Sequence, residues 1–249
     1  MSALETCHDI LARRAAAHPD REALVDHRHR VTYRELLERV ERTAAALQSL
    51  GLGAGDVITI QLPNWVEFAY VFFACERIGA IANQIGPDFR SREVEYIVRF
   101  SESRAFVCPA SFKGFDYVDM VRSLRPQLGG LNAVLVLGRA SDGETVSLDE
   151  LVYGRTPPPP LTPYRMAPDA IMRMAFTSGT TGNPKGVTHS FETTLPAAEI
   201  LNGAMNVTRS RSISSSAARP LKRSSSTARP PAMIDCSSVR YPQLSPSGR

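Results

Sequence analysis

The chain has 249 residues, of which 43% are hydrophobic and 22% charged, so it has room for one large globular domain or two small ones. Its most apolar stretch, residues 65–82, is interrupted by Glu67, Glu76 and Arg77, which excludes a membrane span and favours a buried helix. The N-terminal segment MSALETCHDILARR contains acidic residues and no apolar core run, so we expect no signal peptide.

The formal net charge of +4 is unevenly distributed. Residues 209–249 hold eight Lys or Arg and one acid, Asp235, whereas residues 1–208 carry a net charge of −3. The overall charge therefore says nothing about the partners of the body of the chain. The cysteines are far apart and form no Cys-x-x-Cys pair, which predicts a cytoplasmic protein with free thiols. They are Cys7, Cys75, Cys108 and Cys236.

The N-terminal third predicts a helix, a hairpin and a second helix. The first helix ends at His18, because the residue before a proline is disfavoured in helical geometry. Residues 23–25 and 31–33 flank a polar turn and read as a short antiparallel hairpin. Thr32 and Glu35 then fit a capping box, in which each side chain satisfies a backbone N–H at the start of the following helix.

From residue 57 onward, short apolar strands alternate with amphipathic helices. Strands are expected at residues 57–60, 104–108 and 133–137, with helices between them that open at Asn64 with Glu67, at Ser91 and near Asp116. Ser147 and Glu150 suggest another capping box. This alternation predicts the α/β class with a mostly parallel sheet.

Four consecutive prolines, residues 157–160, predict a stiff extended linker, because each ring fixes φ and removes a backbone donor. The weakly alternating residues 171–176 after this linker read as a strand. Because the chain stops partway through the expected α/β domain, we expect this strand to lack neighbours and to leave apolar surface exposed.

The segment after that strand has the composition of an anion-binding loop. It reads Thr177-Ser178-Gly179-Thr180-Thr181-Gly182-Asn183-Pro184-Lys185-Gly186-Val187. Glycines let the backbone approach a ligand closely, and successive N–H groups can form a nest for an anion. The hydroxyls of Thr177, Ser178, Thr180 and Thr181 can donate to phosphate oxygens, and Lys185 can add a positive charge. The alternative interpretation is a surface turn rich in Gly and Thr that binds no ligand.

The loop is not a Walker A loop, which needs Gly, four residues and then Gly-Lys-Ser/Thr. Counted from Gly179, Pro184 occupies the place of the second Gly and Gly186 that of the Ser/Thr. The string closely resembles instead the signature of the adenylate-forming superfamily, which includes acyl-CoA synthetases, peptide-synthetase adenylation domains and luciferases.

Further blocks upstream and downstream resemble the same family over about residues 1–207. They are Val31–Leu36, similar to the family's Thr-Tyr-x-Glu-Leu block; Gly79–Asn83, similar to its Gly-Ala block; and His189 just after the loop. Phe112–Asp116 is most similar to the branch that activates fatty and alicyclic carboxylic acids. The resemblance thus identifies residues 1–208 as the N-terminal portion of an AMP-binding domain.

The resemblance implies a two-step ligase reaction. A carboxylate attacks the α-phosphorus of Mg·ATP to give acyl-adenylate and pyrophosphate, and coenzyme A then displaces AMP. The resemblance places the β- and γ-phosphates of ATP at Thr177, Ser178, Gly179, Thr180, Thr181, Gly182 and Lys185, and it implies ATP, Mg²⁺ and coenzyme A as cofactors or co-substrates. The later family blocks, which hold adenine, ribose and the catalytic lysine, do not appear in this sequence, so no catalytic residue is assigned and the chain is expected to be inactive alone.

Residues 209–249 contain twelve Ser, seven Arg and five Pro with no apolar periodicity, a composition typical of disorder. A basic arm for nucleic acid is one interpretation. A frameshift product is the other, and we favour it because the segment has a single aromatic residue, Tyr241, for base stacking. A phosphate-binding fragment without catalysis is the alternative function for the whole chain.

Two other features suggest chemistry and have simpler explanations. His27 and His29 could join Cys7 and His8 around a metal, but their place in a polar turn favours solvated side chains and no metal site. Cys75, on an apolar helix face, is expected to be core packing because nothing near it in sequence would lower its pKa.

Overall fold

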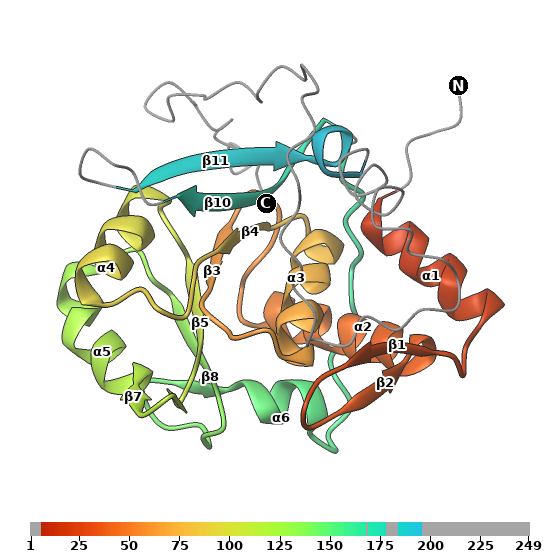
Figure 1. Ribbon diagram of the computed structural model, residues 1–249, viewed down its shortest axis with the longest axis horizontal. Helices are drawn as coiled ribbons and strands as arrows, with labels where there is room; N and C mark the ends of the chain where they lie inside the picture. The colour runs from red at the N-terminus through yellow and green to blue at the C-terminus, as the bar shows by residue number, and fades with distance from the viewer. Residues whose placement is uncertain (1–5, 168, 178–183, 196–249) are drawn as a thin grey trace, which may run out of the picture.

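The computed structural model describes residues 6–167, 169–177 and 184–195 (Figure 1). The predicted tail, residues 209–249, lies outside these described residues. Within them, a seven-stranded sheet has the order β11-β10-β4-β3-β5-β8-β9. Every neighbouring pair is parallel except β10 and β11, which are antiparallel. The α/β class with a mostly parallel sheet is confirmed.

The sheet strands are β3 (Val57–Ile60), β4 (Ile81–Gln84), β5 (Ala105–Pro109), β8 (Ala133–Leu137), β9 (Val146–Ser147), β10 (Ile171–Thr177) and β11 (Lys185–Ser190). The helices are α1 (Cys7–Ala17), α2 (Tyr33–Ser49), α3 (Val66–Ile78), α4 (Ser91–Phe100), α5 (Tyr117–Leu124) and α6 (Leu148–Tyr153), with a 3₁₀ turn at Arg125–Gln127. The described part of the chain also contains a helical turn at residues 191–195 and two hairpins: β1 (Glu22–Val25) with β2 (Arg30–Thr32), and β6 (Ser111–Phe112) with β7 (Phe115–Asp116).

The central strands are buried on both faces, which explains their continuous apolar sequences. Along β8, Leu135 packs with the core under α2, α3 and α6, whereas Val134 and Val136 pack with the core under α4 and α5. Figure 1 shows α4 and α5 on one side of the sheet and α1, α2 and α3 on the other. Cys75 is fully buried in the first core, as expected, and burial raises its thiol pKa.

Local signals at element ends were partly right. The capping box at α2 is confirmed, because Thr32 Oγ1 accepts from Glu35 N at 3.3 Å and Glu35 Oε2 accepts from Thr32 N at 2.8 Å. At α6, Ser147 Oγ accepts from Glu150 N at 3.3 Å, but the return half is missing. Glu150 Oε2 instead accepts from Ser141 Oγ at 2.9 Å.

Two expected helix starts were wrong by one or two residues. Ser91 was expected to cap its helix, but it is the first residue of α4, and Arg90 is the N-cap. Helix α3 begins at Val66, and neither Asn64 nor the N-cap residue Trp65 provides a side-chain cap. Asp26 Oδ2, in the turn between β1 and β2, accepts from Val66 N at 3.1 Å and supplies the cap from 40 residues away.

The expectation that strand 171–176 lacks neighbours was wrong. β10 lies between β4 and β11, and its side chains Met172 and Met174 are 2% and 1% exposed. The physical reason is that β11 pairs antiparallel with β10 and covers the edge that was expected to be open.

The segment that contains the four prolines is fixed to the helices by hydrogen bonds. Gln48 on α2 donates to Thr162 O and accepts from Thr162 N, both at 2.8 Å, and Arg42 Nη2 donates to Thr156 O at 2.6 Å. Tyr164 N donates to the carbonyl of Arg77 at the end of α3 at 2.9 Å. Residues 155–166 therefore form a strap across α2 and α3.

Gly79 explains part of the Gly-Ala block noted in the sequence. It ends α3 with a φ of +78°, a conformation that favours glycine. A Cβ atom at this position would also lie 2.5 Å from the Tyr164 ring of the strap. Among the helices in the described part of the chain, not one combines the length and apolarity that crossing a bilayer requires.

Candidate phosphate-binding site

The two strands that flank the Gly/Thr-rich segment form its stem. β10 and β11 pair antiparallel from Ile171 opposite Ser190 to Thr177 opposite Lys185. The segment between them leaves the sheet at the carboxyl end of β10, on the same edge as the carboxyl ends of the parallel strands β4 and β3. In open α/β sheets this edge is where ligands bind.

The predicted site residues fall into two groups. Thr177 and Lys185 are described, and the final strand pair brings their backbones opposite one another. Lys185 is exposed. Ser178, Gly179, Thr180, Thr181 and Gly182 lie outside the described residues.

The stem next to this pair has an aromatic residue facing a glycine. Phe176 pairs with Gly186, and a Cβ atom on Gly186 would lie 3.2 Å from Cζ of the Phe176 ring. The ring therefore lies over the glycine backbone, an arrangement that stabilises glycine in a strand. A side chain at this position would make a tight contact with the ring, which gives the glycine after the lysine a structural reason.

His189 lies opposite Arg173, four residues beyond Lys185 on β11. Burial and the positive charge of Arg173 both lower the pKa of His189. The imidazole is therefore neutral at physiological pH, and a neutral ring adds no charge for a phosphate.

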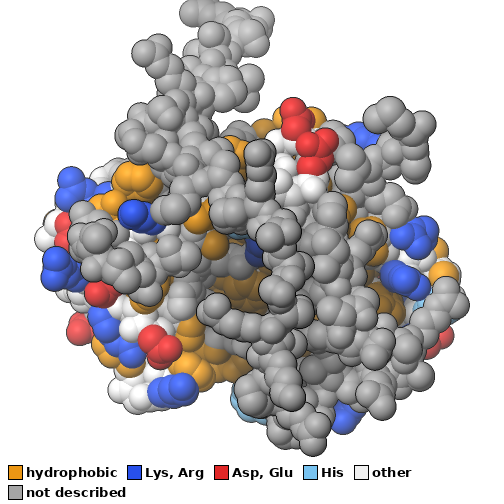
Figure 2. Space-filling view, turned by 45° about the horizontal axis from the view of Figure 1, so that its top comes forward, with side chains coloured by type: hydrophobic (Ala, Val, Ile, Leu, Met, Phe, Trp, Pro, Cys, Tyr) orange, Lys and Arg blue, Asp and Glu red, His pale blue; other side chains and the backbone are white. Residues whose placement is uncertain are grey.

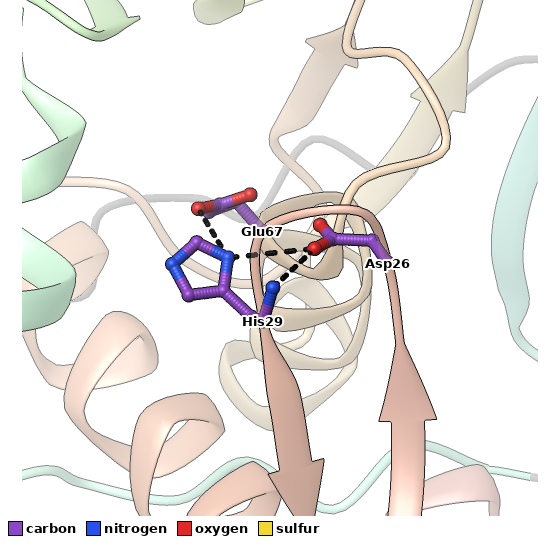
Figure 3. Close-up of side chains that lie close together, drawn as sticks. All are labelled: Asp26, His29 and Glu67. Atoms are coloured by element: carbon purple, nitrogen blue, oxygen red, sulfur yellow. Dashed lines mark hydrogen bonds and ion pairs between the residues drawn. The ribbon is translucent and has the colours of Figure 1, made fainter.

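The histidine and cysteine residues considered as metal ligands do not come together. His8 Nε2 contacts Glu41 Oε1 at 2.6 Å on the α1–α2 side of the molecule. His29 lies instead beside Asp26 and Glu67 (Figure 3), with its Nδ1 3.6 Å from Asp26 Oδ1 and 4.0 Å from Glu67 Oε1. Nothing in the sequence pattern indicated this group, because Glu67 is 38 positions from His29 and no ligand spacing links them.

In the Asp26–His29–Glu67 group, both carboxylates already accept hydrogen bonds from protein donors, whereas His29 Nδ1 has no hydrogen-bond partner among the described residues. Asp26 accepts from the backbone N–H of Arg28 and His29, each at 2.7 Å, as well as from Val66. Burial works against this charge, but the backbone N–H groups outweigh it and hold the Asp26 pKa below its ordinary value. This carboxylate therefore serves the turn and the start of α3.

The carboxylate of Glu67, which is 1% exposed, also accepts hydrogen bonds from protein donors. Arg28 Nη2 donates to its Oε2 at 2.6 Å, and Tyr153 Oη donates to its Oε1 at 2.9 Å. The guanidinium of Arg28 is also 4.3 Å above the Trp65 ring. Because a cation and a hydroxyl already serve both oxygens, the group does not fit Mg²⁺, which prefers several free carboxylate and water oxygens.

Figure 2 turns the β10–β11 side toward the viewer. On the part of this face that the structure describes, hydrophobic side chains gather toward the middle, and side chains of both charge signs lie around the margin. This mixture differs from the uniform basic stripe typical of nucleic-acid-binding faces.

A family model described as "AMP-binding enzyme" matches residues 11–216. The chain therefore belongs to the AMP-binding enzyme family. This finding confirms the resemblance that was based on the loop and its neighbouring blocks.

Three curated relatives illustrate its range. The chain is 38% identical to a 2,3-dihydroxybenzoate-AMP ligase of Bacillus subtilis over 55% of this chain and 26% of that protein. It is 32% identical to the medium-chain acyl-CoA ligase ACSF2 of Danio rerio, over 70% of this chain and 32% of that protein. It is 29% identical to a medium-chain fatty-acid–CoA ligase of Escherichia coli, over 80% of this chain and 35% of that protein. The chain thus spans about a quarter to a third of the length of these relatives.

Solved structures of this family share the fold. Apo MbtA of Mycobacterium smegmatis superposes with a TM-score of 0.67 at 29% identity, covering 76% of this chain and 34% of that one. Acetoacetyl-CoA synthetase of Streptomyces lividans gives 0.65 at 28% identity, covering 74% and 30%.

Proposed function

We propose that this chain binds the pyrophosphate end of ATP as the N-terminal part of an AMP-forming acid–CoA ligase. The observation that supports this most is the β10–β11 stem, which sets Lys185 opposite Thr177 at the carboxyl edge of the sheet. Family membership makes ATP the expected ligand of the segment between them.

In the proposed reaction, a carboxylate oxygen forms a bond to the α-phosphorus of ATP, and the bond to the bridging oxygen of pyrophosphate breaks. The products are acyl-adenylate and pyrophosphate. The thiol of coenzyme A then attacks the acyl carbon and releases AMP. The fatty or alicyclic class of acid is our proposal for the substrate, based on Phe112–Asp116 and the acyl-CoA ligase relatives.

The loop residues would act on the leaving pyrophosphate. Hydroxyls of Thr177, Ser178, Thr180 and Thr181 donate to its oxygens, Gly179 and Gly182 allow close backbone approach, and Lys185 offsets the charge that grows as the bond breaks. The carboxylates of Asp26 and Glu67 do not fit Mg²⁺, so no role in the reaction is assigned to them.

We further propose that the polypeptide alone does not complete the reaction. Adenylation requires the acid oxygen and the α-phosphorus to be held in line, which depends on fixing adenosine and the acid together. The candidate residues contact one end of ATP. The chain is expected to bind the phosphates and to need the remaining portion of the family domain for turnover.

The test is acid-dependent ATP–pyrophosphate exchange on the 249-residue chain, with a panel of fatty and cyclic acids, beside direct binding of pyrophosphate. Binding without exchange is the expected result. Exchange by the chain alone would contradict the proposed inactivity and retain the ligase assignment. Failure to bind pyrophosphate or ATP would contradict the proposed phosphate site.

A further inference from the structure

The stem of the loop is held from the side by a second aromatic residue, Phe100, the last residue of α4. Its ring meets the Phe176 ring edge to face, with centroids 6.1 Å apart and an interplanar angle of 85°. Such pairs stabilise a structure beyond the area they bury. Phe100 is also stacked on Tyr96, one turn earlier in α4, at 5.6 Å.

Phe100 is unusual because it is 41% exposed, one of three large hydrophobic side chains classed as exposed in the described residues. Burial in the core therefore does not explain why an aromatic residue occupies position 100. Outside its own helix, the Phe100 ring contacts the ring of Phe176, which itself lies over Gly186. The contacts run from α4 through Phe100 and Phe176 to the residue that follows Lys185.

The position of this chain of contacts matters for the loop. The Phe176–Gly186 pair is adjacent to the Thr177–Lys185 pair that closes the stem. Glycine weakens a strand because it brings no side chain to pack, so the pair depends on the Phe176 ring for cover. If that ring moves, the last two strand pairs lose their fixed position, and so does the backbone of Lys185.

We infer that Phe100 and Phe176 form an aromatic clasp that positions the loop stem, and with it Lys185, for binding the phosphates of ATP. The inference rests on the proposed function, and it names two positioning residues that do not contact the ligand. A stem held in place before binding lowers the entropy lost on binding, so loss of the clasp weakens affinity in addition to its small effect on global stability.

The main test is Phe100→Ala, with pyrophosphate affinity, amide hydrogen exchange and the thermal midpoint measured on the full 249-residue chain. We expect a Kd for pyrophosphate weaker by about two- to ten-fold, the factor that corresponds to losing one aromatic pair. Exchange should be faster at residues 174–177 and 185–188. The thermal midpoint should change little, because the ring is exposed.

Two further variants make the result specific. Phe100→Tyr keeps the ring and should restore both affinity and slow exchange. Phe112→Ala removes a half-buried ring that packs edge to face on Trp65 at 5.5 Å, in the β6–β7 hairpin, and should leave pyrophosphate affinity unchanged.

The outcomes separate the clasp from the proposed function. If the wild type binds pyrophosphate and Phe100→Ala binds it equally well, the clasp is wrong and the phosphate site stands. If amide hydrogen exchange in the stem is unchanged in Phe100→Ala, the clasp is wrong whatever the pyrophosphate affinity. If the wild type itself binds no pyrophosphate, the proposed function fails, and the positioning role that rests on it fails too.

Discussion

Asp26 in the turn between β1 and β2 accepts a hydrogen bond from the backbone N–H of Val66, the first residue of α3. The hairpin therefore supplies the cap that α3 lacks locally. Because α3 packs against α2, this carboxylate and the Arg28–Glu67 ion pair both connect the N-terminal hairpin to the main helical layer.

Replacing Asp26 by Ala should destabilise the fold. The change removes acceptors for three backbone N–H groups, and loss of an N-cap costs about 1–2 kcal/mol. Urea unfolding measures the difference. Asp20→Ala, at a carboxylate 85% exposed, is the matched control and should change the free energy of unfolding very little. Equal losses in the two variants would contradict the capping role.

Asp26 also predicts a pH dependence. Its pKa lies below the ordinary value of 3.8, so its contribution is present above that value and is lost as the pH falls through its folded-state pKa. The difference in unfolding free energy between wild type and Asp26→Asn should therefore shrink below about pH 4. A difference that stays constant from pH 6 to pH 3 would contradict this account.

Glu76 predicts a pH dependence of stability opposite to that of Asp26. It is 5% exposed, and burial is the main cause of a pKa raised above 4.5, while its Oε2 has no hydrogen-bond partner in the structure. A raised folded-state pKa makes the folded protein lose stability as the pH rises through that pKa. Glu76→Gln should thus gain stability relative to wild type at pH 7 compared with pH 4, in urea titrations at both values. The exposed Glu38→Gln on the same layer should show no such trend.

Gly79 tests the packing of the strap. Gly79→Ala should destabilise by about 1–3 kcal/mol, because alanine is strained at a φ of +78° and its Cβ meets the Tyr164 ring. Thermal unfolding measures the loss. Gly53→Ala is the control, because its φ is not positive and no atom lies within 4 Å of the added Cβ. A Gly79→Ala variant as stable as Gly53→Ala would contradict the close approach of the strap.

Local and periodic features were predictable from the sequence. The apolar runs of β3, β5 and β8 and the capping box at Thr32 depend on nearest neighbours along the chain. β3, β8 and the capping box were found where expected, and β5 is displaced by one residue. The family was recognised from the string of residues in the loop, and the family model confirms that membership.

Features that depend on distant residues were not predictable. The cap of α3 comes from Asp26, the strap is fixed by Gln48, and β10 is covered by β11. Each involves a contact for which the local sequence carries no periodic or spacing signal. The pairing of Phe176 with Gly186, and the ring of Phe100 beside it, belongs to the same class.

The most direct test of the central claim is calorimetric binding of pyrophosphate to the wild type, Lys185→Ala and Lys113→Asn. Lys113 is the other lysine of residues 1–208, and asparagine tolerates its φ of 49°. A charge-assisted contact is worth about 1.5–3 kcal/mol, so Lys185→Ala should weaken binding by roughly ten- to a hundred-fold. Lys113→Asn should bind like the wild type. Equal affinity in the wild type and Lys185→Ala would contradict the assignment of this loop as the phosphate site.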